Sequence, residues 1–494
     1  MSKVSDIYSR CYDKYFYLGL FLGLLTILGI TIYTTNFISG ILFACIPIAC
    51  LILFYFFKFP HSLLITLFIV NYIIMGVSRY VSSISGGIVM DALLLLILFI
   101  LFVRTVFFSV DYWKIFNNPL TYLSLIWLIY CIMEILNPYT TIELWMTSVR
   151  GLGFYLFLFV VVTTALFKRF KDLKQILLLW GILTIFAVLK AVIQKLIGFD
   201  WAENHWLYVE DGARTHIIYS GIRYFSFFTD AANFGCSMAL SMVVFSISAL
   251  YIKSKKLRVF FIIVAILAGY GMLISGTRTV LAILFAGYAT FILISKLGKV
   301  IIGGTFLILS LFIFLNFTNI GQGNADIRRM RTAFHGTEDA SFNVRVENQK
   351  KMREFMPAHP FGIGIGKAKH TDSKDHMYGL ATDSSLIYVW IETGIVGLIL
   401  FISIFLFVLG KGIYDILFRI KNKELKGIMS ALIAGLSGIL IASYGNEVLQ
   451  QFPTGPILYI CMTFIMMGRY FDKEIENREA ENSKLSSENE YTSN

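Results

Sequence analysis

Apolar runs recur along almost the whole chain, each about 18 to 22 residues long, which is the length at which a helix crosses a bilayer core of roughly 30 Å. A backbone in lipid must satisfy its own hydrogen bonds, and runs this long and uninterrupted exclude a β-barrel. Only 15% of the 494 residues are charged, whereas about 25% are charged in soluble proteins. The sequence therefore predicts an all-α polytopic integral membrane helical bundle.

We expect about 14 membrane-spanning helices, and no fewer than about 12, one for each apolar run. The runs lie near 16–34, 36–57, 62–78, 88–109, 118–136, 151–167, 175–197, 231–252, 258–275, 279–296, 299–317, 386–409, 427–445 and 454–469. Two long polar segments interrupt them, the first at 200–230 and the second at 318–385. The second is the one large extracytoplasmic loop, and it separates helices 1–11 (residues 1–317) from helices 12–14 (residues 386–469). The charged tail, 470–494, is expected to be disordered and cytoplasmic.

Basic residues gather in alternate connections between the apolar runs. The clearest are KRFKDLK at 168–174, KSKKLR at 253–258 and the connection 411–426. The positive-inside rule assigns such loops to the cytoplasm, which puts both long polar segments on the other side. The second polar segment has 68 residues, ten of them Lys or Arg, but loops longer than about 60 residues escape the rule. We interpret the net charge of +11 as this asymmetry between loops and expect no nucleic-acid partner.

Arg278 lies in SGTRT, a hairpin of a few residues between two apolar runs, with Gly276 allowing the tight turn. An arginine at membrane depth costs at least about 2.5–3.5 kcal/mol on insertion scales, so something must offset that cost. One interpretation is that Arg278 reaches lipid phosphates. The other is that it grips a phosphorylated ligand, because a guanidinium binds phosphate through two hydrogen bonds and stays charged.

Two further arginines lie in polar motifs on the same side. Arg223 lies in GIRYFSFFTDAANFG, where the aromatic residues suit an interfacial belt, so packing in that belt and ligand binding are both open. Asp230 and Asn233 in this motif are expected to cap the next helix. Arg345 opens a basic amphipathic helix, with Asn343 as its expected N-cap, and such helices commonly lie on a membrane surface.

The end of the second polar segment carries side chains that could act as acids or bases. Asp383 either caps the following helix or serves as an acid/base carboxylate at its mouth. His370 and His376 bracket the loop HTDSKDH, whose spacing fits no familiar zinc or calcium site, so we expect no metal and no cofactor. GIGIGK at 362–367 lacks the preceding strand and the final Ser or Thr of a phosphate-binding loop, and its glycines are interpreted as turn formers.

Five motifs, in their order along residues 220–410, resemble the O-antigen ligase/polymerase superfamily of bacterial inner membranes. They are IRYFSFFTDAANFG at 222–235, ISGTRT at 274–279, FNVRVENQKKM at 342–352, HPFGIGIG at 359–366 and ATDSSLIYVWIETGIVGLILF at 381–401. The resemblance implies a metal-independent glycosyltransferase that uses a glycan on undecaprenyl pyrophosphate as its donor. It places the protein in the bacterial cytoplasmic (inner) membrane with the active site facing the periplasm, in contact with membrane lipid. It leaves open a chain-length regulator as a partner.

The resemblance also implies roles for single residues. Arg223 and Arg278 match the arginines that grip the pyrophosphate, and Arg345 matches the arginine of the large loop. Such a leaving group needs no protonation where preorganised cations neutralise its developing charge, but the acceptor hydroxyl needs a general base. The candidates for that base are Asp383, His370 and His376.

The sequence departs from the ligase pattern at one position. Ligases that join O-antigen to the lipid A core carry a His, usually followed by Asn, where this chain reads Asp383-Ser384. This favours a Wzy-type polymerase that joins lipid-linked repeat units of O-antigen or of a capsular or exopolysaccharide. Ligase-type transfer of a finished glycan to a lipid or protein acceptor is the alternative. A lipid-linked sugar transporter is a third hypothesis, for which Lys190 is the clear charged candidate within a span.

Overall fold

A computed structural model describes residues 37–81, 85–218, 221–296, 298–334, 340–370 and 379–492, together with Phe21, Gly23, Thr26 and Gly29. Most of these residues lie in helices, and the strands in this part of the chain are β1 (Ile217–Ile218) and β2 (Gly221–Ile222), which pair antiparallel. The predicted all-α fold class is confirmed.

The chain divides into two compact units, Met1–Leu64 and Ile65–Asn494. The first contains α2 (Phe37–Lys58), and α3 (His61–Tyr80) crosses the boundary. The second unit continues with α4 (Gly86–Phe108), η1 (Trp113–Asn117), α5 (Pro119–Met133), η2 (Glu134–Leu136), α6 (Ile142–Val149), η3 (Arg150–Phe154), α7 (Tyr155–Leu166) and α8 (Phe170–Leu196). The first polar segment forms α9 (Trp201–Tyr208), α10 (Ala213–His216) and the two strands.

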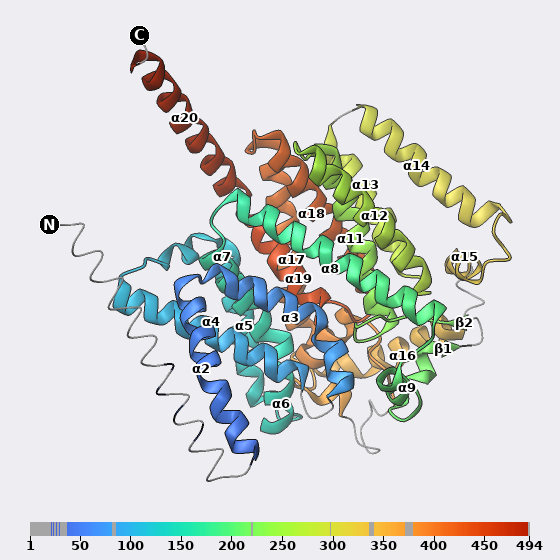
Figure 1. Ribbon diagram of the computed structural model, residues 1–494. Helices are drawn as coiled ribbons and strands as arrows, with labels where there is room; N and C mark the ends of the chain where they lie inside the picture. Colours follow the sequence, from blue (N-terminus) through green and yellow to red (C-terminus); the bar gives the residue numbers. More distant parts are fainter. Residues whose placement is uncertain are drawn as a thin grey trace. The chain divides into compact units, whose positions relative to one another are not determined.

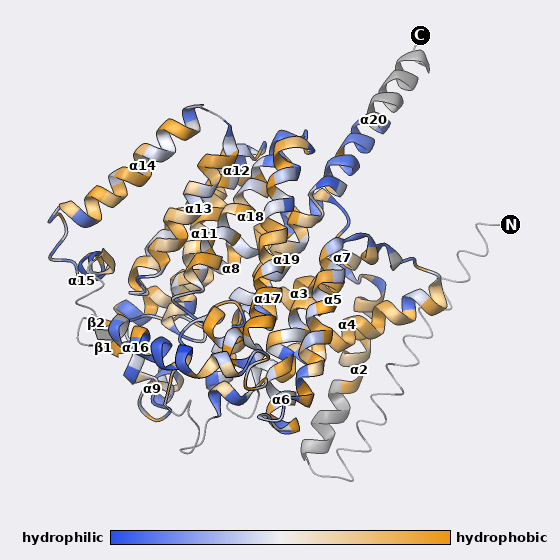
Figure 2. Cartoon of the chain, turned by 180° about the vertical axis from the view of Figure 1, so that it is seen from behind, coloured by the Kyte–Doolittle hydropathy of each residue, from blue (hydrophilic) through white to orange (hydrophobic). Residues whose placement is uncertain are grey.

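The remaining elements belong to the second unit (Figure 1). Four apolar helices follow the strands: α11 (Ala231–Tyr251), α12 (Lys255–Ile274), α13 (Val280–Ser295) and α14 (Gly298–Phe317). The second polar segment folds into α15 (Ala325–Arg331), η4 (Thr332–Phe334), α16 (Ala340–Phe355), η6 (Met356–Ala358) and η7 (Lys367–Lys369). The chain ends with α17 (Ser385–Phe418), α18 (Lys423–Ala442), α19 (Thr454–Met466) and α20 (Gly468–Thr492). Figure 2 shows hydrophobic residues along the bundle helices and hydrophilic ones on α9, α16 and α20.

Nine helical stretches among the described residues are long and apolar enough to cross a membrane. They are His61–Tyr80, Gly86–Phe108, Pro119–Leu136, Ile142–Leu166, Phe170–Leu196, Ala231–Tyr251, Lys255–Ile274, Ser385–Phe418 and Lys423–Ala442. Four shorter apolar helices lie at Ile46–Lys58, Val280–Ser295, Ile301–Phe317 and Thr454–Met466. These stretches coincide with the expected runs from 36–57 to 454–469, whereas most of the first expected run, 16–34, lies outside the described residues. The protein is a multi-pass membrane protein, and the count of 14 spans stays a prediction.

The centre of the second unit is formed by α11, α13 and α18, which pack closely because α18 carries small residues at the contacts. A Cβ atom at Gly438 would lie 2.6 Å from the carbonyl oxygen of Ile283, and one at Gly435 would lie 2.6 Å from Cδ1 of Leu240. Small residues at such crossings let helix backbones approach each other in a membrane. This tight contact fixes which helix ends meet.

The polar motifs and the short basic connections lie at opposite ends of these helices. Because neighbouring helices run antiparallel, the starts of α11, α13 and α17 lie at the same end as the ends of α12 and α18. The basic connection 253–258 and the residues between α17 and α18 lie at the other end of these helices. The two ends of the bundle therefore differ in the way that the loop charges predicted.

Helix α17 is broken by a glycine, and a loop fills the break. Gly394 adopts φ 67° and ψ −172°, a conformation that favours glycine. The HPFGIGIG segment lies against it: the backbone N–H of Ile363 donates to the carbonyl of Ile391 at 2.9 Å, and that of Gly364 donates to Glu392 at 3.1 Å. A Cβ at Gly362 would meet the backbone of Glu392 and Gly394 at 2.5 Å. These glycines form turns and close contacts, as the sequence predicted.

The tail differs from the prediction, because α20 is helical over Gly468–Thr492. Its start is docked: Phe471 is buried, and the Asp472 carboxylate accepts from the backbone N–H groups of Lys421 and Asn422 at 3.0 and 2.9 Å. Further along, Arg478 pairs with Glu474 one turn earlier. Pairs of this spacing, with the high helix propensity of Glu, Lys and Arg, stabilise a helix that composition alone suggested would be disordered.

Candidate functional site

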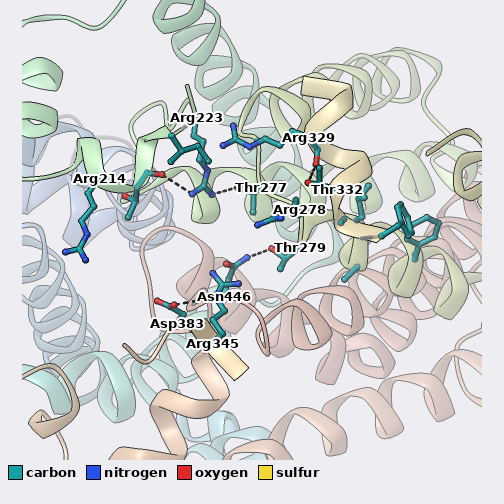
Figure 3. Close-up of a pocket in the computed structure, with 18 residues that line it drawn as sticks. Arg214, Arg223, Thr277, Arg278, Thr279, Arg329, Thr332, Arg345, Asp383 and Asn446 are labelled. Carbon is teal, nitrogen blue, oxygen red and sulfur yellow. Dashed lines mark hydrogen bonds and ion pairs between the residues drawn. The ribbon is translucent and has the colours of Figure 1, made fainter. Parts of the chain in front are cut away.

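A cavity of about 730 Å³ lies where α11 and α13 begin and α12 and α18 end (Figure 3). Its lining includes five arginines and one carboxylate: Arg214, Arg223, Arg278, Arg329, Arg345 and Asp383. Three of these arginines and the aspartate are the ones that the sequence singled out, from motifs far apart along the chain. Thr277, Thr279, Thr332 and Asn446 add polar groups, and Leu281, Phe285 and Phe334 add apolar ones. The arrangement suits an amphiphilic anion.

The Arg223 side chain is held by two different polar segments. Its Nη1 donates to the carbonyl of Thr215 at 3.1 Å, and its Nη2 donates to Oγ1 of Thr277 at 3.0 Å. Thr277 in turn donates to the carbonyl of Ala231 at 3.0 Å. The IRYF and SGTRT motifs therefore meet through one hydroxyl. The expected cap of α11 is confirmed for Asp230, whose carboxylate accepts from the first-turn backbone N–H groups.

Arg278 lies in the turn between α12 and α13 and lines the cavity. The turn needs Gly276, which has φ +61°. Asn446, from the connection after α18, donates to Oγ1 of Thr279 on the other side of Arg278. The position of Arg278 in the cavity favours the ligand interpretation over reach to lipid phosphates.

Arg345 and Asp383 face each other across 3.4 Å, from Nε to Oδ2. Their side chains are 33% and 48% exposed, so both remain accessible from the cavity. The interpretation of Asp383 as a helix cap is wrong, because the cap is Ser384, whose Oγ accepts from the backbone N–H of Ile387 at 3.3 Å. The expected N-cap at Asn343 is wrong too, because α16 already begins at Ala340.

The DSS triplet is fixed to the connection between α18 and α19. Ser384 Oγ donates to the carbonyl of Ser443 at 3.0 Å, and Ser385 Oγ accepts from the N–H groups of Val448 and Leu449 at 2.8 and 3.0 Å. Ser384 caps the helix, so the Asp383 carboxylate does not, and these contacts hold Asp383 at the edge of the cavity. No motif in the sequence pointed to this connection as its support.

Glu447, in that same connection, also escaped the sequence analysis. It forms an ion pair with Lys369 at 2.5 Å. Burial raises the pKa of Glu447, Lys369 opposes that effect, and Asp230 and Asp383 add to the rise through their negative charges. The carboxylates near the cavity are thus close enough to influence one another.

The cationic groups influence one another more strongly. Burial lowers the pKa of Arg223, and Arg278 and Arg345 lower it further by repulsion, although Asp230 opposes them. Burial also lowers the pKa of Arg329 to about 10, with added repulsion from Arg223 and Arg278. Like charges gathered in a half-closed site favour an anion that carries more than one negative charge.

Two of the five cavity arginines were missed from the sequence. Arg214 and Arg329 lie outside the motifs that suggested ligand binding, and Arg329 stands in IRRMR among other basic residues. Only the packing of α15 distinguishes it, because Arg329 is buried and Arg328 is exposed. No local pattern could have separated the two.

The histidine candidates do not join this cluster in the structure. His370 is exposed, its Nδ1 lies 3.0 Å from the carbonyl oxygen of Gly366, and it is not part of the cavity lining. His376 lies outside the described residues. Asp383 is therefore the base candidate that the structure brings beside the arginines.

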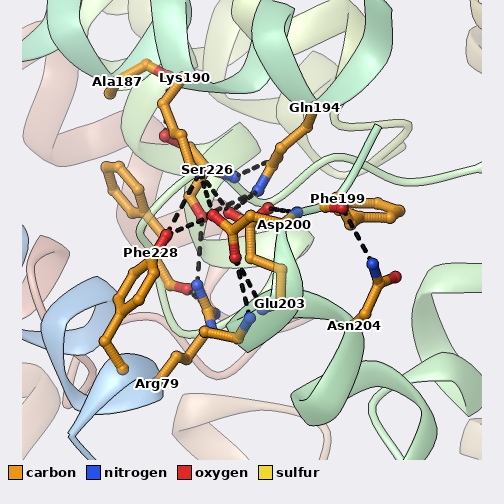
Figure 4. A network of polar contacts seen from close by, with 12 residues as sticks. Arg79, Ala187, Lys190, Gln194, Phe199, Asp200, Glu203, Asn204, Ser226 and Phe228 are labelled. Carbon is orange, nitrogen blue, oxygen red and sulfur yellow. Dashed lines mark hydrogen bonds and ion pairs between the residues drawn. The ribbon is translucent and has the colours of Figure 1, made fainter. Parts of the chain in front are cut away.

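Lys190 has a structural environment at the end of α8 (Figure 4). Its Nζ lies 2.8 Å from Oδ2 of Asp200 and 2.9 Å from Oε1 of Glu203. Gln194 bridges this pair to the cavity motif, since it donates to Glu203 at 2.8 Å and accepts from the backbone N–H of Ser226 at 2.9 Å. The network holds the turn that follows Arg223, so the charge that suggested a transporter is satisfied within the fold.

Comparison with known families gives an independent result. Residues 262–402 match the family model described as O-antigen ligase. The matched stretch contains Arg278, Arg345 and Asp383 and four of the five motifs. A search of curated proteins found no match to the chain. The chain therefore carries a stretch at residues 262–402 that matches the O-antigen ligase family, and this match supports its similarity to the O-antigen ligase/polymerase superfamily.

Proposed function

We propose that this protein is a glycosyltransferase that polymerises oligosaccharide repeat units carried on undecaprenyl pyrophosphate. The observation that carries the proposal is the meeting of Arg223, Arg278 and Arg345 with Asp383 in one cavity. Guanidinium groups bind phosphate oxygens in pairs and keep their charge, which suits a diphosphate leaving group. The apolar part of the lining suits the lipid to which that diphosphate is attached.

At the anomeric carbon of the donor sugar one bond forms and one breaks, and one proton is transferred. The acceptor hydroxyl oxygen attacks the anomeric carbon of the donor sugar while the bond from that carbon to the diphosphate oxygen breaks. Asp383 takes the hydroxyl proton, and the electron pair of the broken bond leaves with the lipid diphosphate. Arg223 and Arg278 stabilise the charge that develops there, and such fixed cations are most effective in a site shielded from water.

Reaction at the extracytoplasmic face is part of the proposal. The cavity lies at the helix ends opposite the basic connection 253–258. Short basic loops stay in the cytoplasm under the positive-inside rule, so the cavity end would face the periplasm of the bacterial inner membrane.

Transfer of a finished glycan by a ligase is the second candidate function. It is supported by the description of the matching family as O-antigen ligase. The polymerase is preferred because this chain reads Asp383-Ser384 at the position where ligases that act on the lipid A core carry a His, usually followed by Asn. Both reactions use the same donor and differ in the acceptor.

The test uses the full chain in lipid nanodiscs with undecaprenyl-pyrophosphate oligosaccharide as the supplied substrate. We expect a ladder of longer chains with the wild type and its loss with Arg278→Ala. Arg353→Ala is the control, because Arg353 is an exposed arginine of α16 and should leave the ladder intact. Full chain extension by Arg278→Ala would argue against the proposed site.

Gene deletion separates polymerase from ligase. A polymerase predicts loss of long chains while single repeat units still reach the acceptor. A ligase predicts that all glycan disappears from the acceptor and accumulates on the lipid carrier. The second pattern would replace the polymerase proposal by the alternative.

A further inference from the structure

Arg329 is a buried cation on a short helix of the second polar segment. Its exposed fraction is 7%, although α15 is only seven residues long and Arg328 beside it is exposed. Arg331, two residues later, is also buried but donates to the carbonyls of Thr318 and Ile320 near the end of α14, so it has a structural role. Arg329 instead lines the cavity. Burial and contact with the cavity distinguish it from both neighbours.

The donor atoms at this place are not all used. Nη2 of Arg329 and Nε of Arg223 are buried and lack a hydrogen-bond partner among the described residues. In the same part of the chain no ion pair joins Arg329 to a carboxylate, and Asp326, the acid of α15, pairs with Lys195 at 2.5 Å. A buried charged donor without a partner is costly, and folded proteins seldom retain one without a function.

The turn of SGTRT makes room for this arginine. A Cβ atom at Gly276 would lie 2.5 Å from Nη1 of Arg329 and 3.0 Å from its Cζ. Gly276 therefore permits the φ of +61°, and any larger residue there would also have to displace the Arg329 guanidinium. The same glycine that allows the Arg278 turn also brings Arg329 against it.

Arg329 lies among other cationic side chains of the cavity, and the negative charge of Asp326 on its own helix opposes their repulsion. Figure 3 shows Arg223, Arg278 and Arg329 near one another, with Arg345 and Asp383 on the opposite side. Repulsion from Arg223 and Arg278 lowers the pKa of Arg329 in addition to burial, which places the three groups within electrostatic reach. Asp383 is already engaged with Arg345. Three guanidiniums offer more paired donors than one phosphate group can accept.

We propose that Arg329 completes a subsite for a diphosphate with Arg223 and Arg278, and that Gly276 is present to admit it. The subsite distinguishes a lipid diphosphate from the corresponding monophosphate, because the second phosphate supplies acceptors for the donors that are otherwise unused. This inference rests on the proposed function, since it assigns a selectivity to the same cavity.

The test measures binding to the full chain in nanodiscs, with undecaprenyl pyrophosphate and undecaprenyl monophosphate as the two probes. We expect Arg329→Ala to weaken diphosphate binding by about 10- to 100-fold, the loss typical of a hydrogen-bonded charge. Monophosphate binding should change by less than about 3-fold. Arg328→Ala is the matched control and should bind both probes like the wild type.

Thermal unfolding provides a readout that a merely structural arginine would not give. Removing a buried cation that Arg223 and Arg278 repel should raise the melting temperature of the ligand-free protein. The stabilisation conferred by undecaprenyl pyrophosphate should fall in the same variant. A structural arginine predicts the reverse for the ligand-free protein, namely a lower melting temperature.

Gly276→Ala tests the second half of the proposal. It should weaken diphosphate binding, and it should do so by a smaller factor in the Arg329→Ala background than in the wild type, because the part of its effect that acts through Arg329 is then absent. If Gly276→Ala does not fold, Arg329→Lys replaces it and should recover part of the affinity that Arg329→Ala loses. Unchanged diphosphate binding by Arg329→Ala, or equal loss of both probes, would overturn the inference while leaving the proposed function intact. Failure of the wild type to bind either probe would overturn both.

Discussion

Replacing Thr277 by Val tests whether the cavity arginines form a preorganised site. Thr277 is 3% exposed, and its hydroxyl links Arg223 to the start of α11. Valine has nearly the same shape and lacks only the hydroxyl. The substitution therefore removes the side-chain partner of Nη2 of Arg223 and leaves both motifs in place.

The size of the effect follows from that one contact. A hydrogen bond to a charged group contributes about 1.5–3 kcal/mol, and each 1.4 kcal/mol is tenfold in affinity. The carbonyl of Ala231 lies in the first turn of α11, where carbonyls accept intrahelical bonds, so it does not become an orphan. We expect Thr277→Val to lower kcat/KM for the lipid diphosphate donor by about 10- to 150-fold.

The assay is chain extension by the full chain in nanodiscs, with donor binding measured in parallel. Thr463→Val is the matched control: Thr463 is buried in α19 and its hydroxyl donates to Tyr459 within the same helix, at 2.8 Å. It should leave kcat/KM within about 2-fold of the wild type. A Thr277→Val protein with unchanged kcat/KM would refute the view that Arg223 must be held in place.

Three further outcomes are expected. Asp383→Asn should lower kcat by about 10²–10⁴-fold with little change in donor binding, as measured by single-turnover transfer, and equal losses of both would contradict a general-base role. Gly394→Ala should lower the yield and melting temperature, because backbone strain alone costs about 1–3 kcal/mol and the new Cβ would lie 2.0 Å from the carbonyl oxygen of Pro360. Gly410→Ala is the control in the same helix: its new Cβ would meet nothing within 4 Å, so the variant should be tolerated. Burial lowers the pKa of His216 to about 4, below the unfolded value of about 6.5. The unfolded chain therefore binds more protons between these two values, and the stability of the protein should fall as the pH drops from about 6.5 toward 4. A melting temperature that is flat over this range, or a His216→Gln variant with the wild-type slope, would disprove the assignment.

The helices were predictable because their cause is local. An apolar run of the right length must form a helix in lipid, whatever its neighbours are. The predicted runs 231–252 and 454–469 accordingly match α11 and α19 closely. Helix ends were less predictable, because a cap depends on which side chain reaches a free backbone N–H, and here Ser384 does so in place of Asp383.

The C-terminal tail was predicted incorrectly because its structure depends on contacts with distant parts of the chain. Composition suggested disorder from 470 onward, because the segment buries few apolar groups. The start of α20 is instead stabilised by contacts with residues about fifty positions earlier, through Asp472 and the backbone of Lys421 and Asn422. Contacts over such a distance along the chain cannot be read from the segment itself.

The candidate site was predictable in its parts and not in its assembly. Arg278 could be selected because an arginine at membrane depth is costly and needs a reason, and Arg223 and Arg345 could be selected through the motifs that resemble the family. Arg329 could not be selected, because in sequence it is one basic residue among several. Its role depends on burial, and burial is decided by the packing of α15 against the turn at Gly276.

The sequence by itself determined the all-α membrane class, the helices and the arginines worth attention, because hydrophobicity and charge cost act residue by residue along the chain. Only the tertiary structure decided that these arginines share a cavity with Asp383, that Ser384 is the helix cap, and that His370 stands apart. The physical reason is that convergence depends on which helix ends meet, and that follows from the close packing of α11, α13 and α18 through small residues.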